Sequence, residues 1–329
     1  MIEIVAPGPL ASVQDLGRRG HRAIGVGVSG AMDRLALLVG NLLLGNDAGS
    51  AGIEFTLGAF QVRFEQAMAF ALTGADCGAT LDGIPLPPWW CGRAEAGQLL
   101  AAGPAHTGMR AYLAVAGGLD VAAVLGSRST DLKAGFGGHQ GRQLTPGDRI
   151  PCLAPEPEAG RAARFPPAGF GVLPPELVLS DGLDAAETAV RVIPAAEYGI
   201  FMPEAQEAFW SAAWQVHPDS NRIGYRLTGP TLAAREAREL LSHGIVPGVV
   251  QVPPSGQPVI QMSDANTAGG YPKMGVVISA DLRRLAQLRL GGTLRFVRAT
   301  QEEAVAALHR ESAYVARIAR LAKLATQVV

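Results

Sequence analysis

Short segments in which apolar and polar residues alternate recur in both halves of the chain. Residues 60–64 (FQVRF) have the two-residue period of a half-buried strand, and residues 110–116 and 293–297 show the same behaviour. The dipeptide Asp82-Gly83 lies between short apolar runs and predicts a hairpin turn. Because strands do not alternate with long helices, a doubly wound parallel sheet is disfavoured. The pattern predicts a mainly β protein.

Helical patterns are few by comparison. The expected helices are an apolar face over residues 35–43 flanked by Asp33 and Gly45, a helix that starts at Pro203, a short helix over Asp281–Leu288, and a C-terminal helix that follows a Thr300/Glu303 capping box and reaches about Leu324. Most of the core must therefore come from sheets.

The length of 329 residues suits two domains better than one core. A proline-rich stretch over residues 151–176, with little hydrophobic periodicity, predicts the boundary, and we expect domains over 1–160 and 161–329. The segments 18–21 (RRGH) and 222–225 (RIGY) both consist of Arg, any residue, Gly and a residue whose side chain contains a ring. This weak echo suggests two similar barrel-like domains.

Composition and charge exclude several classes of function. The formal net charge is −1, so no global field attracts nucleic acid or anionic lipid. The three cysteines are widely separated and form no Cys/His cluster, so we expect no zinc site and a reducing, cytoplasmic setting. Residues 1–5 resemble a first strand rather than an export signal, and no run of eighteen apolar residues predicts a membrane helix.

The densest concentration of polar groups lies in residues 261–275, between two apolar runs. The candidate site residues in this segment are Asp264, Asn266, Thr267, Gly269, Gly270, Tyr271 and Lys273. Asp264 could act as a general base, Lys273 could bind a phosphate or carboxylate, and the two glycines could adopt left-handed φ values and form an anion-binding nest. The structural alternative is a hairpin loop whose polar groups satisfy one another.

Arginines supply the other candidate anion contacts. Arg222 and Arg226 have the period-two spacing of one strand face, so both could meet one anion, although an ordinary ion pair is the alternative for Arg222. A glycine-rich segment, 135–142, carries His139, Gln140 and Arg142, and a serine-rich turn carries Arg128. These two segments could bind an anion, or they could be a tightly packed turn and a turn capped by its own side chains.

Longer segments resemble one known family. The segments that carry the resemblance are 8–18, 29–33, 110–118, 125–131, 242–248 and 251–258, the last of which (QVPPSGQP) leads toward the polar loop. They are similar to allophanate hydrolase subunit 2, also called the biotin-dependent carboxyltransferase domain family. The family includes the C subunit of the three-part ATP-dependent 5-oxoprolinase and an antagonist of a sporulation-kinase inhibitor.

The resemblance implies two cyclophilin-like β-barrel domains and a function beside other chains. The implied partners are a subunit-1-type protein similar to the B subunit of 5-oxoprolinase, and a lactam-utilisation-type protein similar to its A subunit. The implied reaction is opening of the pyroglutamate lactam coupled to cleavage of ATP, which the complex would bind. On this interpretation Arg222, Asp264 and Lys273 are catalytic, while Gln251 joins the remaining loop residues and Gln140, Arg142 and Arg128 in binding substrate or anion.

Two alternatives remain open within the resemblance. One is carboxyl transfer from carboxybiotin to urea or a related amide, although this chain has no evident biotin attachment site. The other is a regulatory protein that binds a kinase inhibitor. The chain departs from the family pattern at His21, Asn221, Ala265 and Asn266, and the lack of an arginine at 265 bears on the substrate more than on the fold.

Overall fold

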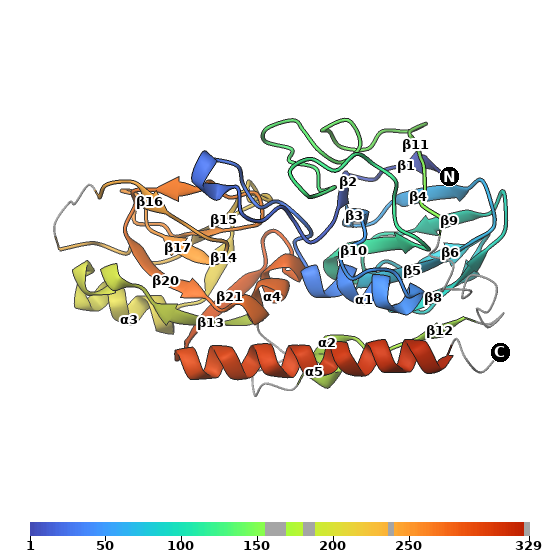
Figure 1. Ribbon diagram of the computed structural model, residues 1–329. Coiled ribbons are helices and arrows are strands. Elements are labelled where there is room, and N and C mark those ends of the chain that lie inside the picture. The colour runs from blue at the N-terminus through green and yellow to red at the C-terminus, as the bar shows by residue number, and fades with distance from the viewer. Residues whose placement is uncertain (155–168, 180–187, 236–239, 326–329) are drawn as a thin grey trace. The chain divides into compact units, whose positions relative to one another are not determined.

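The structure is a computed structural model that describes residues 1–154, 169–179, 188–235 and 240–325. Its contacts divide the chain into two compact units, whose elements are labelled in Figure 1. The first unit contains Met1–Arg18, Ser29–Leu179 and Ser312–Val329, and the second contains Arg19–Val28 and Ser180–Glu311. The predicted boundary at residue 160 lies outside the described residues and stays a prediction.

The first unit is built on two six-stranded sheets whose paired strands are antiparallel. The first sheet has the order β11 (Arg149–Ile150), β1 (Ile2–Ala6), β4 (Phe60–Phe64), β9 (Leu99–Ala102), β6 (Thr80–Leu81) and β7 (Ile84–Pro85). The second has the order β12 (Phe170–Gly171), β8 (Trp90–Ala94), β5 (Met68–Asp76), β10 (Thr107–Val115), β3 (Gly52–Thr56) and β2 (Leu10–Gln14).

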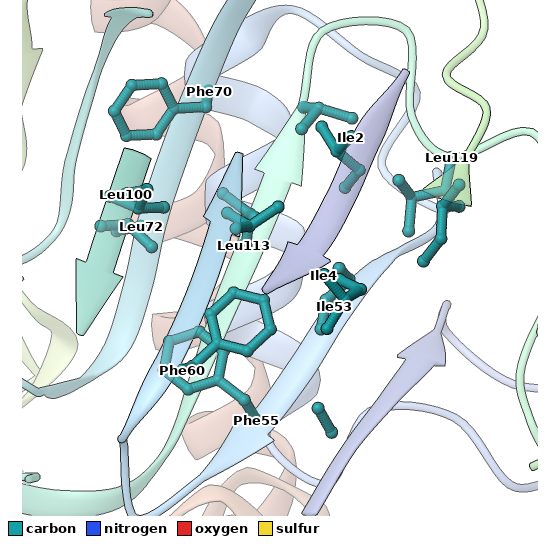
Figure 2. Packing of buried hydrophobic residues seen from close by; sticks show 14 of the residues in the cluster. Ile2, Ile4, Ile53, Phe55, Phe60, Phe70, Leu72, Leu100, Leu113 and Leu119 are labelled. Atoms are coloured by element: carbon teal, nitrogen blue, oxygen red, sulfur yellow. The ribbon is translucent and has the colours of Figure 1, made fainter. Parts of the chain in front are cut away.

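The core of this unit joins residues of both sheets (Figure 2). Ile4 and Phe60 from the first sheet and Phe55 and Leu113 from the second are at most 1% exposed. The rings of Phe55 and Phe60 stack with centroids 4.4 Å apart. Burial of each such side chain contributes about 1.5–3 kcal/mol, so the alternation seen in residues 60–64 follows directly from this core.

Helix α1 (Arg34–Leu44) begins and ends where its caps predict. The side chain of Asp33 accepts a hydrogen bond from the Ala36 backbone, and Gly45 adopts a left-handed φ of 69° after the last turn. Its buried side packs with Tyr112 and Ala114 of β10 in a second apolar cluster. The first unit also contains the short helix α2 (Pro175–Val178).

The second unit is a closed barrel of seven strands. Their order is β13 (Thr188–Pro194), β20 (Lys273–Val277), β17 (Val249–Gln251), β18 (Val259–Gln261), β15 (Gly224–Thr228), β14 (Trp214–Val216) and β21 (Thr293–Arg298). The parallel pair of β13 and β21 belongs to this closed circle. Outside it, a two-stranded ribbon joins β16 (His243–Gly244) to β19 (Ala268–Gly269).

Short helical elements complete the second unit. They are η1 (Arg22–Ile24), η3 (Ala196–Ile200), α3 (Pro203–Ser211), η4 (Ser279–Asp281) and α4 (Leu282–Gln287). The C-terminal helix α5 (Gln301–Ala325) has the predicted capping box, since Thr300 N donates to Glu303 Oε2 at 2.8 Å and Glu303 N donates to Thr300 Oγ1 at 3.2 Å. Residues up to Glu311 belong to the second unit and those from Ser312 to the first.

The mainly β class and a β-barrel are confirmed, as are the predicted strands, helices and hairpin. The barrel is the second unit, whereas the described strands of the first unit form the two sheets above rather than a closed barrel. Among the described residues, no helix is both long enough and apolar enough to span a membrane.

Candidate functional site

A row of polar side chains crosses one side of the barrel wall. In the register of β15, β18 and β17, Tyr225 faces Ile260 and Ile260 faces Val250, and all three are 0% exposed core residues. Strand alternation therefore turns Gln261 and Gln251 toward the other side of the wall. There Gln261 Nε2 donates to Gln251 Oε1 at 2.9 Å.

The row continues onto β20, where Lys273 is the cross-strand partner of Gln251. A bulge between Val250 and Gln251 adjusts the register at this point. Gln251 and Lys273 are 4% and 5% exposed, so the row is buried although it lies outside the barrel core. Another segment must therefore cover the row, and the polar groups of the row need hydrogen-bond partners there.

The cover is the β16–β19 ribbon together with the turn that follows it. A Cβ placed on Gly269 would lie 2.7 Å from Gln251 Nε2, which shows how closely β19 approaches the row. Gln251 Nε2 also donates to the backbone oxygen of Tyr271 at 3.5 Å. The polar loop predicted between two strands connects β18 to β20, and it folds back over Gln251 of β17, which lies between them in the barrel.

Neither Gly269 nor Gly270 has a positive φ, so the left-handed φ values that glycine permits are not used at these positions. Gly269 pairs with His243 in the antiparallel ribbon, so the two glycines do not form an anion nest there. Both positions exclude a side chain for steric reasons. A Cβ on Gly270 would lie 2.6 Å from Leu240 O.

Lys273 ends in a cluster with His243 and Glu197. Nδ1 of His243 lies 3.0 Å from Leu241 O. Because a carbonyl oxygen only accepts, Nδ1 carries the proton, and Nε2 accepts a hydrogen bond from Lys273 Nζ. Glu197 Oε1, presented by η3, lies 3.5 Å from Nζ and 3.4 Å from Nε2.

These three side chains differ in their access to solvent. The side chain of Lys273 is 7% exposed, that of Glu197 is 20% exposed and that of His243 is 44% exposed. A buried ammonium is thus connected to solvent through an imidazole, with a carboxylate beside both. Such an arrangement can hold an anion or transfer a proton.

Arg222 and Asp264 form a second charged group of the same unit. Arg222 Nε and Nη2 donate to the two carboxylate oxygens of Asp264 at 2.9 and 3.1 Å. Their side chains are 4% and 3% exposed, and Asp264 N donates to Arg222 O at 2.9 Å. This is the ion pair named above as the alternative for Arg222, and its partner is the loop aspartate itself. Arg226 is exposed, whereas Arg222 is buried, so the two arginines do not share one environment.

The other residues of the loop take varied positions. The backbone oxygen of Thr267 accepts from Ile245 N at 3.1 Å and from Arg22 Nη2 at 3.4 Å. Asn266 is exposed, and Tyr271 is 49% exposed. Tyr271 and Asn266 therefore lie at the surface of the loop, whereas Asp264 and Lys273 are buried.

The candidate residues of the first unit, Arg128, Gln140 and Arg142, have internal partners. Arg142 donates to both oxygens of Asp148, at 2.7 and 2.8 Å, and to Gln140 Oε1 at 3.0 Å. The guanidinium holds the pKa of Asp148 well below its usual range, and its own pKa is raised by the same hydrogen bonds. His139 lies 3.5 Å from the same carboxylate.

The serine-rich turn does bind an anion, and that anion is Asp15. Ser127 Oγ and Ser129 Oγ donate to Asp15 Oδ1 at 2.7 and 2.5 Å, and Arg128 N donates to Oδ2 at 2.6 Å. The Arg128 Nε donates to Val121 O at 2.9 Å. The glycine-rich segment is likewise tightly packed, since a Cβ on Gly138 would lie 1.9 Å from Thr130 Oγ1.

Sequence reasoning did not select His243, Glu197 or Gln261 as site residues. Val259 is the cross-strand partner of Gln251, and the two-residue spacing from Val259 to Gln261 places Gln261 on the same face as Gln251. No local signal links Glu197 to Lys273, since their contact depends on barrel closure. In the part of the chain that the structure describes, no group of three or more His, Cys, Asp and Glu residues could hold a metal ion.

The fold and site thus define a mainly β protein with a buried lysine in a charged cluster on a barrel wall. Residues 24–298 match the model of the family described as carboxyltransferase domain, subdomain A and B, and the chain belongs to this family. It is 44% identical to the C subunit of 5-oxoprolinase from Escherichia coli over 319 residues, which cover 97% of this chain and 98% of that protein. The corresponding protein of Haemophilus influenzae is 40% identical over 98% of both chains.

Much longer proteins contain a similar region. The chain is 34% identical to a urea amidolyase of Lachancea kluyveri over 90% of its own length but only 17% of that protein. The crystal structure of the urea amidolyase of K. lactis matches 96% of this chain with a TM-score of 0.86 and 29% identity, and the match covers 20% of that chain.

Proposed function

We propose that the chain is the C subunit of an ATP-dependent 5-oxoprolinase, which opens the lactam ring of 5-oxoproline to give glutamate. The observation that carries this proposal is the 44% identity to a protein of that name, with nearly complete coverage of both chains. Similarity over nearly the full length of both chains favours the same role in the same kind of assembly. The same relatives, each named as a C subunit, support the placement of this chain in a multi-subunit hydrolase.

The chemistry of a lactam explains why cations matter. An amide carbonyl is a poor electrophile, and transfer of a phosphoryl group from ATP to its oxygen would activate the carbon toward water. That route needs groups that stabilise negative charge and supply protons more than it needs a strong nucleophile. Lys273 supplies positive charge, and exposed Tyr271 offers a phenol at the loop surface.

Other chains would complete the enzyme. We propose a subunit-1-type protein and a lactam-utilisation-type protein as partners, with ATP bound by the assembled complex. Arg222 and Asp264 then serve mainly to hold the loop in place, because each is already engaged by the other. Lys273 is the catalytic candidate that the geometry favours.

Similarity to urea amidolyases supports a second candidate, carboxyl transfer to urea or a related amide. The match to this chain covers only about a fifth of such a protein. The two candidates differ in the co-substrate that the assembly consumes together with ATP. Bicarbonate and biotin are needed for the second and not for the first.

The test is reconstitution with the two partner proteins from the same genome. We expect 5-oxoproline-dependent formation of glutamate and ADP that requires all three chains and is insensitive to avidin. Avidin-sensitive, bicarbonate-dependent consumption of urea would instead support carboxyl transfer. Binding between chains without any turnover on either substrate would favour a regulatory protein and overturn the proposal.

A further inference from the structure

We infer that His243, Lys273 and Glu197 form a proton relay that protonates the nitrogen of the opened lactam and so keeps ATP cleavage coupled to ring opening. This inference rests on the proposed function and assigns roles to residues of the same unit. Its first support is the direct contact between Lys273 Nζ and His243 Nε2, whose direction is set by the bond from Nδ1 to Leu241 O.

The second support is the charge of the cluster. With Lys273 as ammonium, His243 neutral and Glu197 ionised, the net charge of the three groups is zero. Passing one proton from Nζ to Nε2 gives an amine and an imidazolium, and the net charge is still zero. Since Glu197 Oε1 is 3.5 Å from Nζ and 3.4 Å from Nε2, it stabilises the proton about equally at both positions. Glu197 therefore does not bias the proton toward either nitrogen.

The third support is the gradient of exposure. The Lys273 side chain is 7% exposed, which limits exchange of its proton with solvent. The His243 side chain is 44% exposed and can contact water. His243 can thus receive a proton from an attacking water and Lys273 can deliver one to a substrate atom. The two ends of the relay are different groups with different surroundings.

The balanced step begins with the lactam whose carbonyl oxygen carries the phosphoryl group and whose nitrogen carries hydrogen. Lys273 Nζ first turns its N–H from His243 Nε2 to the ring nitrogen, which frees the lone pair of Nε2. A water oxygen then bonds to the ring carbon and loses one proton to Nε2. Lys273 Nζ gives a proton to the ring nitrogen, and the C–N bond breaks with its electron pair on nitrogen. The new hydroxyl releases its proton to solvent as the carbonyl forms, leaving an acyl phosphate. His243 then returns its proton to Lys273, and a second water hydrolyses the acyl phosphate to carboxylate and phosphate.

The relay decides which group leaves the tetrahedral carbon. Phosphate is a good leaving group without help, whereas an amine must be protonated before it departs. If nitrogen is not protonated, phosphate leaves first, the lactam is regenerated and ATP has been consumed for nothing. Loss of the relay should therefore raise the number of ATP molecules cleaved per glutamate formed.

The experiment measures this ratio in the assembled three-chain complex, with 5-oxoproline and ATP. We expect His243→Ala to raise the ratio of ADP to glutamate at least about tenfold, and added imidazole to lower it again. Lys273→Arg keeps the positive charge but holds its proton too tightly, so it should raise the ratio as well. The matched control is His217→Ala, because His217 is 46% exposed and 3.5 Å from Asp219, as His243 is beside Glu197.

A purely structural role predicts a different result. If His243→Ala and His243→Asn slow ADP and glutamate formation equally, or leave both unchanged, the relay is overturned. If the unmodified complex forms no glutamate from 5-oxoproline, the proposed function fails and the relay fails with it. A normal unmodified complex with an unchanged ratio in the variants rejects the relay alone.

Discussion

Two buried cations of the second unit, Arg222 and Lys273, show how the same charge can serve different ends. Arg222 meets Asp264 through two hydrogen bonds, and both side chains are at most 4% exposed. Lys273 is buried almost as deeply, but its neighbours His243 and Glu197 reach toward solvent. A closed pair holds a loop, whereas a buried cation with an accessible partner can exchange a proton. The solvent exposure of the partner side chain, more than the burial of the cation, separates the structural role from the proton-exchanging role.

The largest effect should come from breaking the closed pair. Arg222→Ala leaves the Asp264 carboxylate buried without its cation, and we expect it to lower the free energy of unfolding by about 3–5 kcal/mol. Chemical denaturation of the chain measures this loss. Arg226→Ala, at an exposed position of the neighbouring strand, should change it by less than about 0.5 kcal/mol. Equal effects of the two variants would contradict the comparison.

Removing the second cation should affect turnover more than stability. Lys273→Met retains the length of the side chain, and Glu197 is partly exposed, so water can compensate the carboxylate. We expect glutamate formation by the complex to fall by about a hundredfold, in the range of lost acid–base catalysis. Steady-state kinetics at saturating ATP measure this. A loss of stability as large as that of Arg222→Ala, with full activity in the folded fraction, would show that Lys273 is structural.

The ribbon that covers the polar row provides a test of intermediate size. Gly269→Ala would place a methyl group 2.7 Å from Gln251 Nε2, and we expect a destabilisation of about 1–3 kcal/mol. Gly244→Ala is the matched control, because it lies in the partner strand of the ribbon and its Cβ would meet nothing within 4 Å. Thermal unfolding of both variants distinguishes them. If Gly269→Ala is tolerated as well as its control, the ribbon does not press on the row.

The smallest effect concerns the Arg142–Asp148 pair of the first unit, whose cation is more than one-third exposed. Because Arg142 lowers the pKa of folded Asp148, the stabilisation is present above the unfolded pKa of about 4 and is lost as pH falls below it. Arg142→Gln should therefore cost about 0.5–1 kcal/mol at pH 7 and less at pH 3. Denaturation at both pH values checks this, and a larger cost at pH 3 would reverse the sign.

What the sequence could predict was local. The Asp33 and Gly45 caps, the Thr300/Glu303 box and the hairpin at Asp82-Gly83 lie within a few residues of the elements that they control. Each therefore has its physical cause in adjacent positions. The alternating pattern alone did not specify a barrel, which was expected from the weak internal echo and from the resemblance to a family.

The geometry around the candidate site could be predicted only in part. Asp264 and Lys273 were selected because polar groups are concentrated in one loop, and Gln251 was added through the resemblance to a family. Gln251 and Lys273 are indeed cross-strand partners in the barrel. Their partners depend on distant contacts: Glu197 reaches Lys273 only once β13 pairs with β20. The sequence could not decide whether the two glycines provide a left-handed φ or provide space, and in the structure they provide space.

Closure of the barrel has a consequence for the evolution of its surface. Each of its seven strands is hydrogen-bonded to neighbours on both sides, so these described strands offer no open edge onto which a foreign strand could add. Insertions or changes in the loops above the wall are then tolerated without the penalty of self-association. Diversification of substrate within such a scaffold can proceed through the loops while the wall stays constant.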